Sequence, residues 1–263
     1  MSARPCLVLK IGGALVADAG ALAPLWASVT KLRPHTDVVV VHGGGPQATA
    51  LAHRLGHTPR MVHGRRVTTD LDLDVVTWVL RGQVNTALVA QAQATGLPAV
   101  GTSALDAATA QVTKRPPWTV DGETIDFGWV GDVAQVDPAY LRHLLAGGYL
   151  PVVASLGMDA SGQVYNVNAD TIACVIAEAV QASAFGLVTD SGGVRRHADD
   201  PASHLATCTR AQFEAGVAEG WIAGGMRPKL TVAFRALDSG IPEVRILAPG
   251  DLARDEAGTR VLP

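Results

Sequence analysis

The chain has 263 residues, of which 48% are hydrophobic and only 17% are charged. That length suits one large or two small domains, and the apolar composition excludes disorder as the main state. Because the net charge is −3 and no block of five or more like charges occurs, the basic surface that nucleic acid requires is excluded as well.

Short apolar runs rich in Val, Ile and Leu, each halted by glycine, recur along the chain. Runs that are apolar on both faces are typical of strands buried between two helix layers. In chain order they are CLVLKIGG (6–13), DVVVVHGGG (37–45), LPAVGTSA (97–104), YLPVVASLG (149–157), AFGLVTDSGG (184–193) and EVRILAPG (243–250).

Stretches with helical periodicity separate these runs, and the alternation predicts an α/β sandwich. The helices are expected at 22–32, 47–55, 70–94, 138–145, 169–182 and 228–237. Segment 111–130 and a short strand at 162–167 are expected to form hairpins over one sheet edge. No linker or shift of composition separates domains, so we expect one domain over 1–263 with a break in the sheet near 157–168.

Cys6, Cys174 and Cys208 lie far apart among apolar neighbours, which predicts reduced, buried thiols. The N-terminal segment lacks an apolar stretch long enough for a signal peptide, and the apolar region at 144–158 is interrupted by Gly and Pro. We therefore expect a soluble, cytoplasmic protein without a membrane span.

Two glycine loops follow the first two apolar runs. Lys10 ends the first run and precedes Gly12 and Gly13, and the second run ends in His42 and the triplet 43–45. Backbone N–H groups in such loops converge on anions, and a helix that begins near residue 46 adds its positive end. The pattern predicts a place for two anionic groups, although glycine turns that only connect strand to helix remain an alternative.

Several classes of enzyme are disfavoured by missing motifs. Neither glycine loop has the spacing of a P-loop or of a dinucleotide fingerprint. His53 and His57 share helical spacing without a third ligand nearby, so we expect solvated histidines and no metal site of the protein's own. Ser103, Ser155 and Ser191 lack the context of a nucleophile elbow.

Seven motifs occur in an order that resembles a known family: LVLKIGG, VVVVHGGGPQ, HGRRVT, GYLPVVASLG, YNVNADTIA, LVTDSGGV and GGMRPKL. Over about residues 7–261 the chain resembles the amino acid kinase superfamily and, through HGRRVT and NVNAD, its acetylglutamate kinases. Those enzymes phosphorylate the side-chain carboxylate of N-acetyl-L-glutamate with ATP in arginine biosynthesis. The resemblance implies a three-layer sandwich with an open, mostly parallel central sheet, an N-terminal lobe (about 1–160) for the amino acid and a C-terminal lobe (161–263) for the nucleotide.

The resemblance also implies which residues carry the reaction. Lys10 and Lys229 match the two catalytic lysines that stabilise the transferring phosphoryl group, and Asp170 matches the acidic residue that holds both lysines. From the residues alone, the lysines could equally be surface groups at element ends, and Asp170 could simply favour a helix start. The expected cofactor is ATP with Mg²⁺ held mainly by the nucleotide phosphates.

For the amino acid substrate, the resemblance assigns Arg66 to the α-carboxylate, the amides of Gly44 and Gly45 to hydrogen bonds, and Asn166 to the acetamide. The alignment through GRRVT selects Arg66, so its neighbour Arg65 is expected to be solvated.

For the nucleotide, the matching positions come from both loops and a late segment, and Trp221–Ala223 could instead be ordinary packing at a helix end. Asn168 is expected near the phosphates, but it could equally cap the helix that follows. Two positions depart from the family: the loop after Asp190 is polar, and Thr86 stands where a lysine is common. The full set is Gly12, Gly13, Asn168, Asp190, Ser191, Gly192, Gly193, Trp221, Ile222 and Ala223.

Two other functions stay open at this point. One is a related carboxylate kinase that acts on a carrier-linked aminoadipate or glutamate, and the other is a non-catalytic small-molecule sensor on the same fold. We expect a homodimer, and, because only residues 1–5 precede the first strand, one that arginine does not inhibit.

Overall fold

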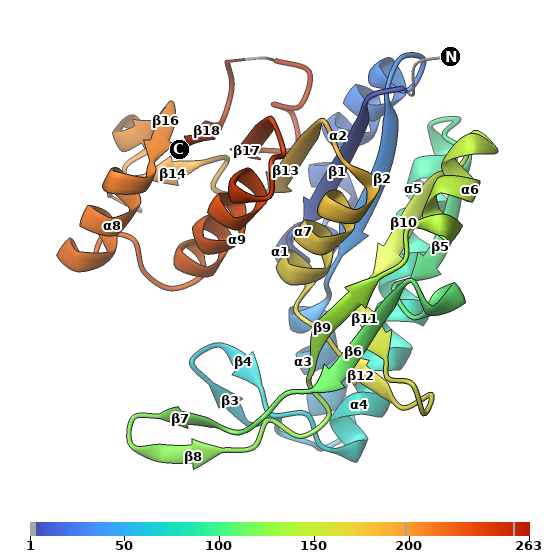
Figure 1. Cartoon of the computed structure of the whole chain (residues 1–263), viewed down its shortest axis with the longest axis vertical. Coiled ribbons are helices and arrows are strands. Elements are labelled where there is room, and N and C mark those ends of the chain that lie inside the picture. The colour runs from blue at the N-terminus through green and yellow to red at the C-terminus, as the bar shows by residue number, and fades with distance from the viewer. Residues whose placement is uncertain (1–3, 198, 255) are drawn as a thin grey trace.

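The six apolar runs form parallel strands of one sheet, which confirms the predicted fold class. They are β1 (Cys6–Ile11), β2 (Asp37–His42), β5 (Ala99–Ser103), β10 (Leu150–Ala154), β13 (Ala184–Val188) and β17 (Glu243–Leu247). The sequence did not indicate β16 (Thr207–Thr209) and β18 (Thr259–Leu262), which extend the sheet; β18 runs antiparallel to β17. The order is β16-β18-β17-β13-β1-β2-β10-β5 in the computed structural model, which describes residues 4–197, 199–254 and 256–263 (Figure 1).

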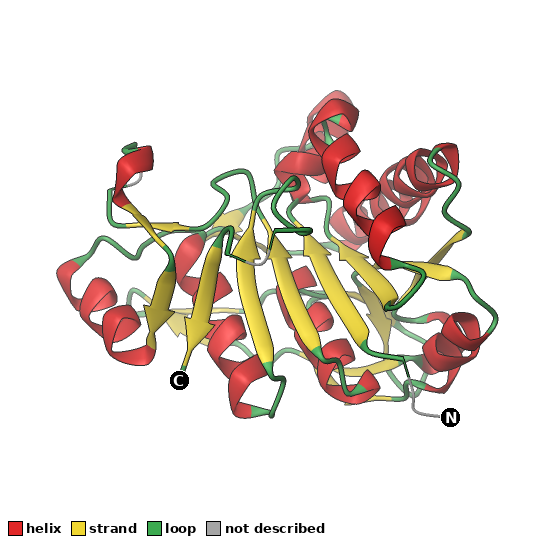
Figure 2. Cartoon of the chain, turned by 90° about the horizontal axis from the view of Figure 1, so that it is seen from above, coloured by secondary structure: helices red, strands yellow, loops and turns green. Residues whose placement is uncertain are grey.

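Helices cover both faces of this sheet (Figure 2). One face carries α2 (Ala19–Leu32), α3 (Gly45–Arg54), α4 (Asp70–Thr77), the π-helical segment η1 (Trp78–Val84) and α5 (Asn85–Ala94). The other carries α6 (Ala139–Ala146), α7 (Ala169–Val180) and α9 (Met226–Asp238). The predicted helix 70–94 is therefore three segments, and α1 (Gly13–Val16) and α8 (Arg210–Glu219) were not expected.

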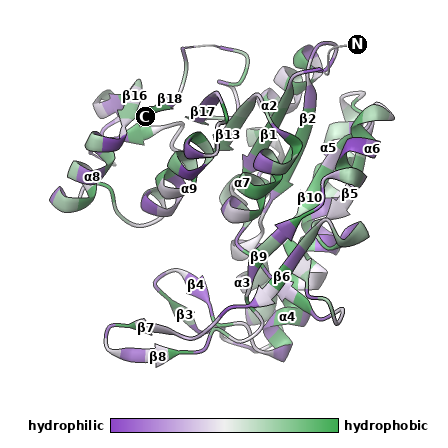
Figure 3. Ribbon diagram, viewed as in Figure 1, coloured by the Kyte–Doolittle hydropathy of each residue, from purple (hydrophilic) through white to green (hydrophobic). Residues whose placement is uncertain are grey.

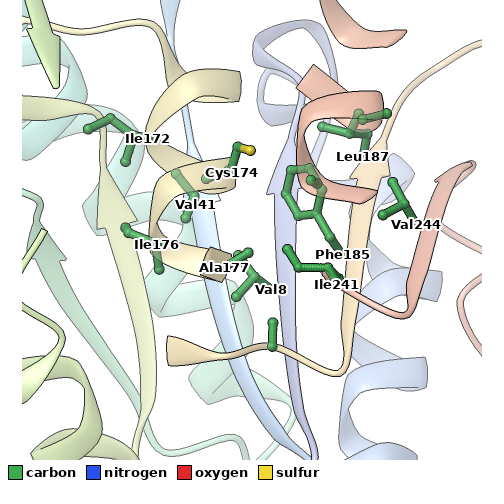
Figure 4. Packing of buried hydrophobic residues seen from close by; sticks show 14 of the residues in the cluster. Val8, Val41, Ile172, Cys174, Ile176, Ala177, Phe185, Leu187, Ile241 and Val244 are labelled. Atoms are coloured by element: carbon green, nitrogen blue, oxygen red, sulfur yellow. The ribbon is translucent and has the colours of Figure 1, made fainter. Parts of the chain in front are cut away.

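The alternation of side chains along the strands makes two cores. Val8 on β1 faces α7, whereas its neighbours Leu7 and Leu9 face the opposite helix layer. Phe185, Ile176 and the residues around them fill the first core (Figure 4). The sheet strands are accordingly the most hydrophobic part of the chain (Figure 3).

A smaller sheet and several hairpins extend from the carboxyl ends of the strands (Figure 1). The small sheet has the order β12-β11-β6-β9, from β12 (Val164–Asn166), β11 (Leu156–Met158), β6 (Ala110–Lys114) and β9 (Gly131–Val136). The hairpins are β3–β4 (Met61–Val62, Arg65–Arg66), β7–β8 (Trp118–Val120, Glu123–Ile125) and β14–β15 (Val194–Arg195, His204–Leu205). The short 3-10 turns η2 (Asp106–Ala108) and η3 (Pro201–Ser203) complete the elements.

The first two hairpins have two-residue turns with positive φ at both central positions. His63 and Gly64 have φ of 45° and 74°, and Asp121 and Gly122 have 51° and 84°. This pattern belongs to type I′ turns, which match the twist of the flanking strands. Of the hairpins expected from 111–130 and 162–167, β7–β8 lies in the first segment, and β12 matches the short strand of the second and pairs with β11; the β3–β4 hairpin was not expected.

The three cysteines are buried and unpaired, as predicted. Burial, the largest cause, raises the pKa of the Cys6 thiol to about 12. None of the described helices has the length and apolar character that crossing a membrane requires.

His42, at the end of β2, belongs to a buried hydrogen-bond network under the second glycine loop. Its Nε2 lies 2.9 Å from Nδ2 of Asn85, whose two N–H groups are shared with the carbonyl oxygens of Thr102 (3.2 Å) and Val152 (2.8 Å). Its Nδ1 lies 2.8 Å from the carbonyl oxygen of Gly43. An amide nitrogen only donates, so Nε2 accepts and the imidazole is neutral, with its proton on Nδ1.

Acidification is expected to weaken the fold through His42. Burial, the largest cause, lowers its pKa to about 4, whereas an unfolded histidine titrates near ~6.5. The neutral, buried imidazole therefore contributes to the free energy of unfolding. This contribution is fully present above the pKa of the unfolded histidine, and about 3 kcal/mol in total is lost as the pH falls toward 4. Urea unfolding at about pH 7.5 and about pH 4.5 measures this loss of stability in the wild type and in His42→Gln. The part of the loss that comes from His42 should be absent in the variant. An equal loss of stability in both proteins would contradict the assignment to His42.

Candidate active site

A cavity of about 750 Å³ lies where β1, β2 and β12 end, beside the start of α7. The walls come from both glycine loops, the β3–β4 hairpin and the residues before α7. The structure thereby brings most of the predicted phosphate and substrate positions together: Lys10, Gly13, Gly44, Gly45, Arg66, Asn166 and Asn168.

The two glycine loops meet at the base of this cavity. The side chain of Gln47 donates from Nε2 to the carbonyl oxygen of Gly13 at 2.8 Å. A Cβ on Gly13 would lie 3.0 Å from Cδ of Pro46, and a Cβ on Gly44 would lie 2.6 Å from a methyl group of Leu80. A side chain at either glycine would require these neighbours to shift, and the start of α3 adds its N–H groups to the wall.

Lys10 and Asp170 form a buried ion pair, with 2.7 Å between Nζ and Oδ1. Each residue is 7% exposed. Lys10 stands near the end of the central strand β1, and Asp170 lies in the first turn of α7. The pair places a fixed positive charge beside both glycine loops, where an anionic group would be bound.

Lys229 differs from the expectation that Asp170 holds both lysines. Its Nζ donates to the carbonyl oxygen of Gly225, one turn earlier, at 3.0 Å, and no ion pair joins it to Asp170 within the described residues. It still lies in the field of this centre. Burial, the largest cause, and Lys10 lower the pKa of Lys229 against the opposing effects of Asp170 and Asp190.

Arg66 is buried and held by groups on two helices, α3 and α4. Its Nη1 lies 3.2 Å from Oδ1 of Asp72, and its Nη2 donates to Oγ1 of Thr49 at 2.6 Å and to the carbonyl oxygen of Gly45 at 3.4 Å. These bonds fix one edge of the guanidinium and leave Nε and part of Nη1 for a ligand.

Asp72 is a partner of Arg66 that the sequence analysis did not identify. It forms a capping box with Thr69 at the start of α4. It also contacts His57, whose Nε2 lies 3.2 Å from Oδ1 of Asp72. Burial alone would raise the pKa of Asp72, but hydrogen bonds from Thr69, His57 and Arg66 lower it. His57 is accordingly a partner of Asp72, not the freely solvated histidine that was expected. The TTDLD sequence, a capping-box pattern, was the available signal.

The expectation for Arg65 is wrong. Arg65 is half-buried and lines the cavity, and its guanidinium lies 5.0 Å from the ring centroid of Trp118 on the β7–β8 hairpin. Arg115 lines the same wall and lies 4.4 Å from that ring. Residues next to each other on a two-residue strand can both reach a cavity when it wraps around the hairpin.

The two asparagines have different surroundings. Asn166 donates from Nδ2 to Oγ1 of Thr68 at 3.2 Å and lines the cavity. Asn168 accepts from the backbone N–H of Thr171 at 3.0 Å and caps α7, so the capping alternative describes its side chain in this structure. Both remain at the cavity wall.

The residues expected for the nucleotide lie outside this cavity, apart from Gly13 and Asn168; Gly12 bonds to Val188. Those at 190–193 form a turn after β13, in which a Cβ on Gly193 would lie 2.4 Å from Nε2 of His204. Trp221 is half-buried, Ala223 is exposed, and Ile222 packs in the main core at 2% exposure. For Ile222 the structure shows the helix-end packing that was the alternative.

The chemistry of the site suits anions and not a metal bound by protein side chains. No group of three or more His, Cys, Asp or Glu side chains able to hold a metal occurs in the described part of the chain. The cavity instead offers glycine amides, Lys10 and three arginines. Such a site binds carboxylates and phosphates.

Comparison with known proteins decides the family. Residues 5–248 match the model of the amino acid kinase family. The chain belongs to the amino acid kinase family. An acetylglutamate kinase of Anaeromyxobacter dehalogenans (strain 2CP-C) is 43% identical over 256 residues, which cover 94% of this chain and 93% of the relative.

Solved structures share the architecture of this chain. An N-acetylglutamate synthase from Neisseria gonorrhoeae, complexed with coenzyme A and N-acetyl-glutamate, superposes with a TM-score of 0.81 at 26% identity, over 98% of this chain and 59% of that chain. A carbamate kinase from Giardia lamblia bound to AMP-PNP gives 0.72 at 14% identity over 100% and 99% of the two chains. The amino acid kinase fold is therefore shared even where little sequence is.

The ion pair at the base of the site is expected to be visible in stability. Asp170→Asn leaves the buried Lys10 without its partner and removes a negative charge that also acts on Lys229, whereas Lys10→Met leaves Asp170 with the electrostatic influence of Lys229. Because a buried charge without its partner costs ~3–5 kcal/mol, both variants should unfold more easily, and Asp170→Asn more than Lys10→Met. Urea unfolding of both and of the double variant completes the cycle. Strictly additive losses would show that the two side chains do not interact.

Proposed function

We propose that this chain transfers the γ-phosphoryl group of ATP to the side-chain carboxylate of N-acetyl-L-glutamate, a step of arginine biosynthesis. The observation that carries the proposal is the cavity that joins the Lys10–Asp170 pair, both glycine loops and Arg66. Relatives named acetylglutamate kinase that are 40–43% identical over nearly the whole chain support it.

The reaction needs positioning and positive charge more than proton transfer. A glutamate side-chain carboxylate has a pKa of ~4.3, so it is ionised at neutral pH and attacks without a general base. One of its oxygens bonds to the γ-phosphorus while the bond to the β–γ bridging oxygen breaks, which gives an acyl phosphate and ADP. Two unit charges ~4 Å apart repel by about 4 kcal/mol at an effective dielectric near 20, and fixed cations must offset this.

The cavity residues divide this work by position. Lys10, fixed by Asp170, lies beside the glycine loops, where the phosphoryl group would be transferred. Arg66, fixed by Asp72, presents its remaining N–H groups to the α-carboxylate. Asn166 and the amides of the 43–45 loop complete the substrate wall.

Lys229 and the turn at 190–193 are the proposed nucleotide side. Lys229 would approach the phosphates from α9, because it already interacts electrostatically with Lys10 and Asp170. Mg²⁺ fits this arrangement as an ion bound by the nucleotide phosphates. It prefers phosphate oxygens and water as ligands to a site made only of protein side chains. The lobe boundary near residue 160 and a cytoplasmic location stay predictions.

The proposal is tested by ADP formation with magnesium-ATP and a panel of acceptors: N-acetylglutamate, glutamate, aspartate, carbamate and N-acetylaminoadipate. We expect the highest kcat/KM with N-acetylglutamate. Lys229→Ala should lower kcat by about a hundredfold or more with little change in the KM values, because its charge acts on the transition state. The exposed variant Arg60→Gln is the matched control. A clear preference for another acceptor would refute the proposal.

We also propose that the chain forms a homodimer. Leu71 and Trp78 are 42% and 55% exposed and lie seven residues apart, on one side of α4 and the start of η1. A second copy would cover this apolar pair. Light scattering should give twice the 27.2 kDa chain mass for the wild type and for Tyr149→Glu, a control on another surface, but a monomer for Trp78→Glu. Monomeric wild-type protein would refute the proposal.

A further inference from the structure

Two hairpins come together beside the cavity, and β3–β4 is the one that lines it. The β3–β4 hairpin contributes Arg65, and the β7–β8 hairpin contributes Trp118, whose ring lies 5.0 Å from the Arg65 guanidinium. At the hairpin tips, Nε2 of His63 lies 2.7 Å from Oδ2 of Asp121. The hairpins, next to each other in Figure 1, therefore form one wall that places Arg65 against Trp118.

Arg115 fixes the base of this wall. Its Nε and Nη2 donate to Oδ1 of Asp132 at 3.0 and 2.6 Å, and its guanidinium lies 4.4 Å from the Trp118 ring centroid. The side chain is buried and its backbone N–H donates to Val130 at 2.8 Å. Arg115 is thus immobilised, and its own carboxylate partner already matches its charge.

Arg65 has no such partner. No carboxylate of the described residues forms an ion pair with it, and its contacts are the indole ring and the strand pairing of β4 with β3. Burial, the largest cause, and the neighbouring Arg115 lower the pKa of Arg65, and these effects exceed the opposing influence of Asp132 and Asp170. Asp132 and Asp170 therefore act on Arg65 only from a distance, and no carboxylate of the described residues is in ion-pair contact with it.

The other cavity cations make Arg65 the exception. Lys10 is paired with Asp170, Arg66 with Asp72, and Arg115 with Asp132. A half-buried guanidinium without an anion is costly, and the cost grows when a ligand excludes water from the cavity. The chemistry that relieves it is a carboxylate, which a planar guanidinium binds with two parallel hydrogen bonds.

We propose that Arg65, stacked on Trp118 beside Arg115, is a carboxylate-binding subsite for the acyl amino acid, separate from the phosphoryl-transfer centre at Lys10. The inference rests on the proposed function, since it assigns a further contact to the same substrate. The carboxylate has two possible sources: the α-carboxylate, shared with Arg66, or a carboxylate at the end of the N-acyl group. A cavity of about 750 Å³ falls in the range that holds drug-sized ligands, so its volume admits an acyl group longer than acetyl.

The test compares three acceptors in wild type and Arg65→Gln: N-acetyl-, N-butyryl- and N-succinyl-L-glutamate. The last two have acyl chains of equal length, and only the succinyl chain ends in a carboxylate. Loss of a hydrogen bond to a charged group corresponds to a rise of about tenfold or more in KM. A rise for N-succinylglutamate alone identifies the acyl carboxylate, and an equal rise for all three acceptors identifies the α-carboxylate. Either result supports the subsite.

Two controls separate a binding role from a structural one. Arg60→Gln removes a charge from the segment before β3 outside the cavity lining and should leave every KM unchanged. Arg65→Lys keeps the charge but not the planar fork, so it should recover only part of the lost affinity. Thermal unfolding of Arg65→Gln should match the wild type.

Three results would overturn the subsite: unchanged acceptor KM values in Arg65→Gln, a rise confined to the KM of ATP, or a loss of kcat alone. Failure of the proposed function is distinguishable, because wild-type protein would then phosphorylate none of the three acceptors. In that case calorimetric titration with N-succinylglutamate in the absence of ATP still decides the subsite. Binding that Arg65→Gln weakens supports it, and no binding, or equal binding in both proteins, overturns it.

Discussion

The ion pair between Lys10 and Asp170 is the interaction on which the site depends. β1 lies between β2 and β13 in the sheet, so a lysine near its end is nearly enclosed and is tolerated only because a carboxylate lies 2.7 Å away. That carboxylate is placed by α7, which is held by its apolar face: Ile172, Ile176 and their neighbours pack on the sheet. The packing of one helix on one strand thereby fixes a positive charge beside both glycine loops.

The strands that were predicted correctly are those whose surroundings are uniform. β1, β2 and β13 are covered by helices on both faces. Burial on both faces requires a continuous apolar run, and that pattern is visible in the sequence. β16 and β18 lie toward the sheet edge, where only some side chains are buried. Their sequences, TCT and TRVL, therefore lack a continuous apolar run and resemble those of many loops. The hairpin turns His63–Gly64 and Asp121–Gly122 did carry a signal, since positive φ at two successive positions favours an X–Gly pair.

The candidate site was predictable where strand ends converge, because parallel strands meet at one edge of the sheet. This rule placed Lys10 and Gly44 in one cavity, whereas Arg66, on the β3–β4 hairpin, was assigned by the family resemblance. It says nothing of long-range side-chain partners, so Asp72 and Arg115 were missed. It also fails for Arg65. The expectation of one solvated and one inward arginine assumes a strand with one solvent-exposed face, whereas both arginines of this hairpin line the cavity.

Charge matching orders the cavity from one side to the other. At the glycine loops Lys10 is held by Asp170, and backbone N–H groups and the helix ends add positive potential beside it without a further ion. His42 beneath the loop is neutral and adds no competing charge there. At the hairpin wall the balance is different, since Arg65 brings a charge that no neighbouring carboxylate cancels. Under the proposed function, an acceptor with two carboxylates would bind with one end toward the hairpins and its reacting carboxylate toward Lys10.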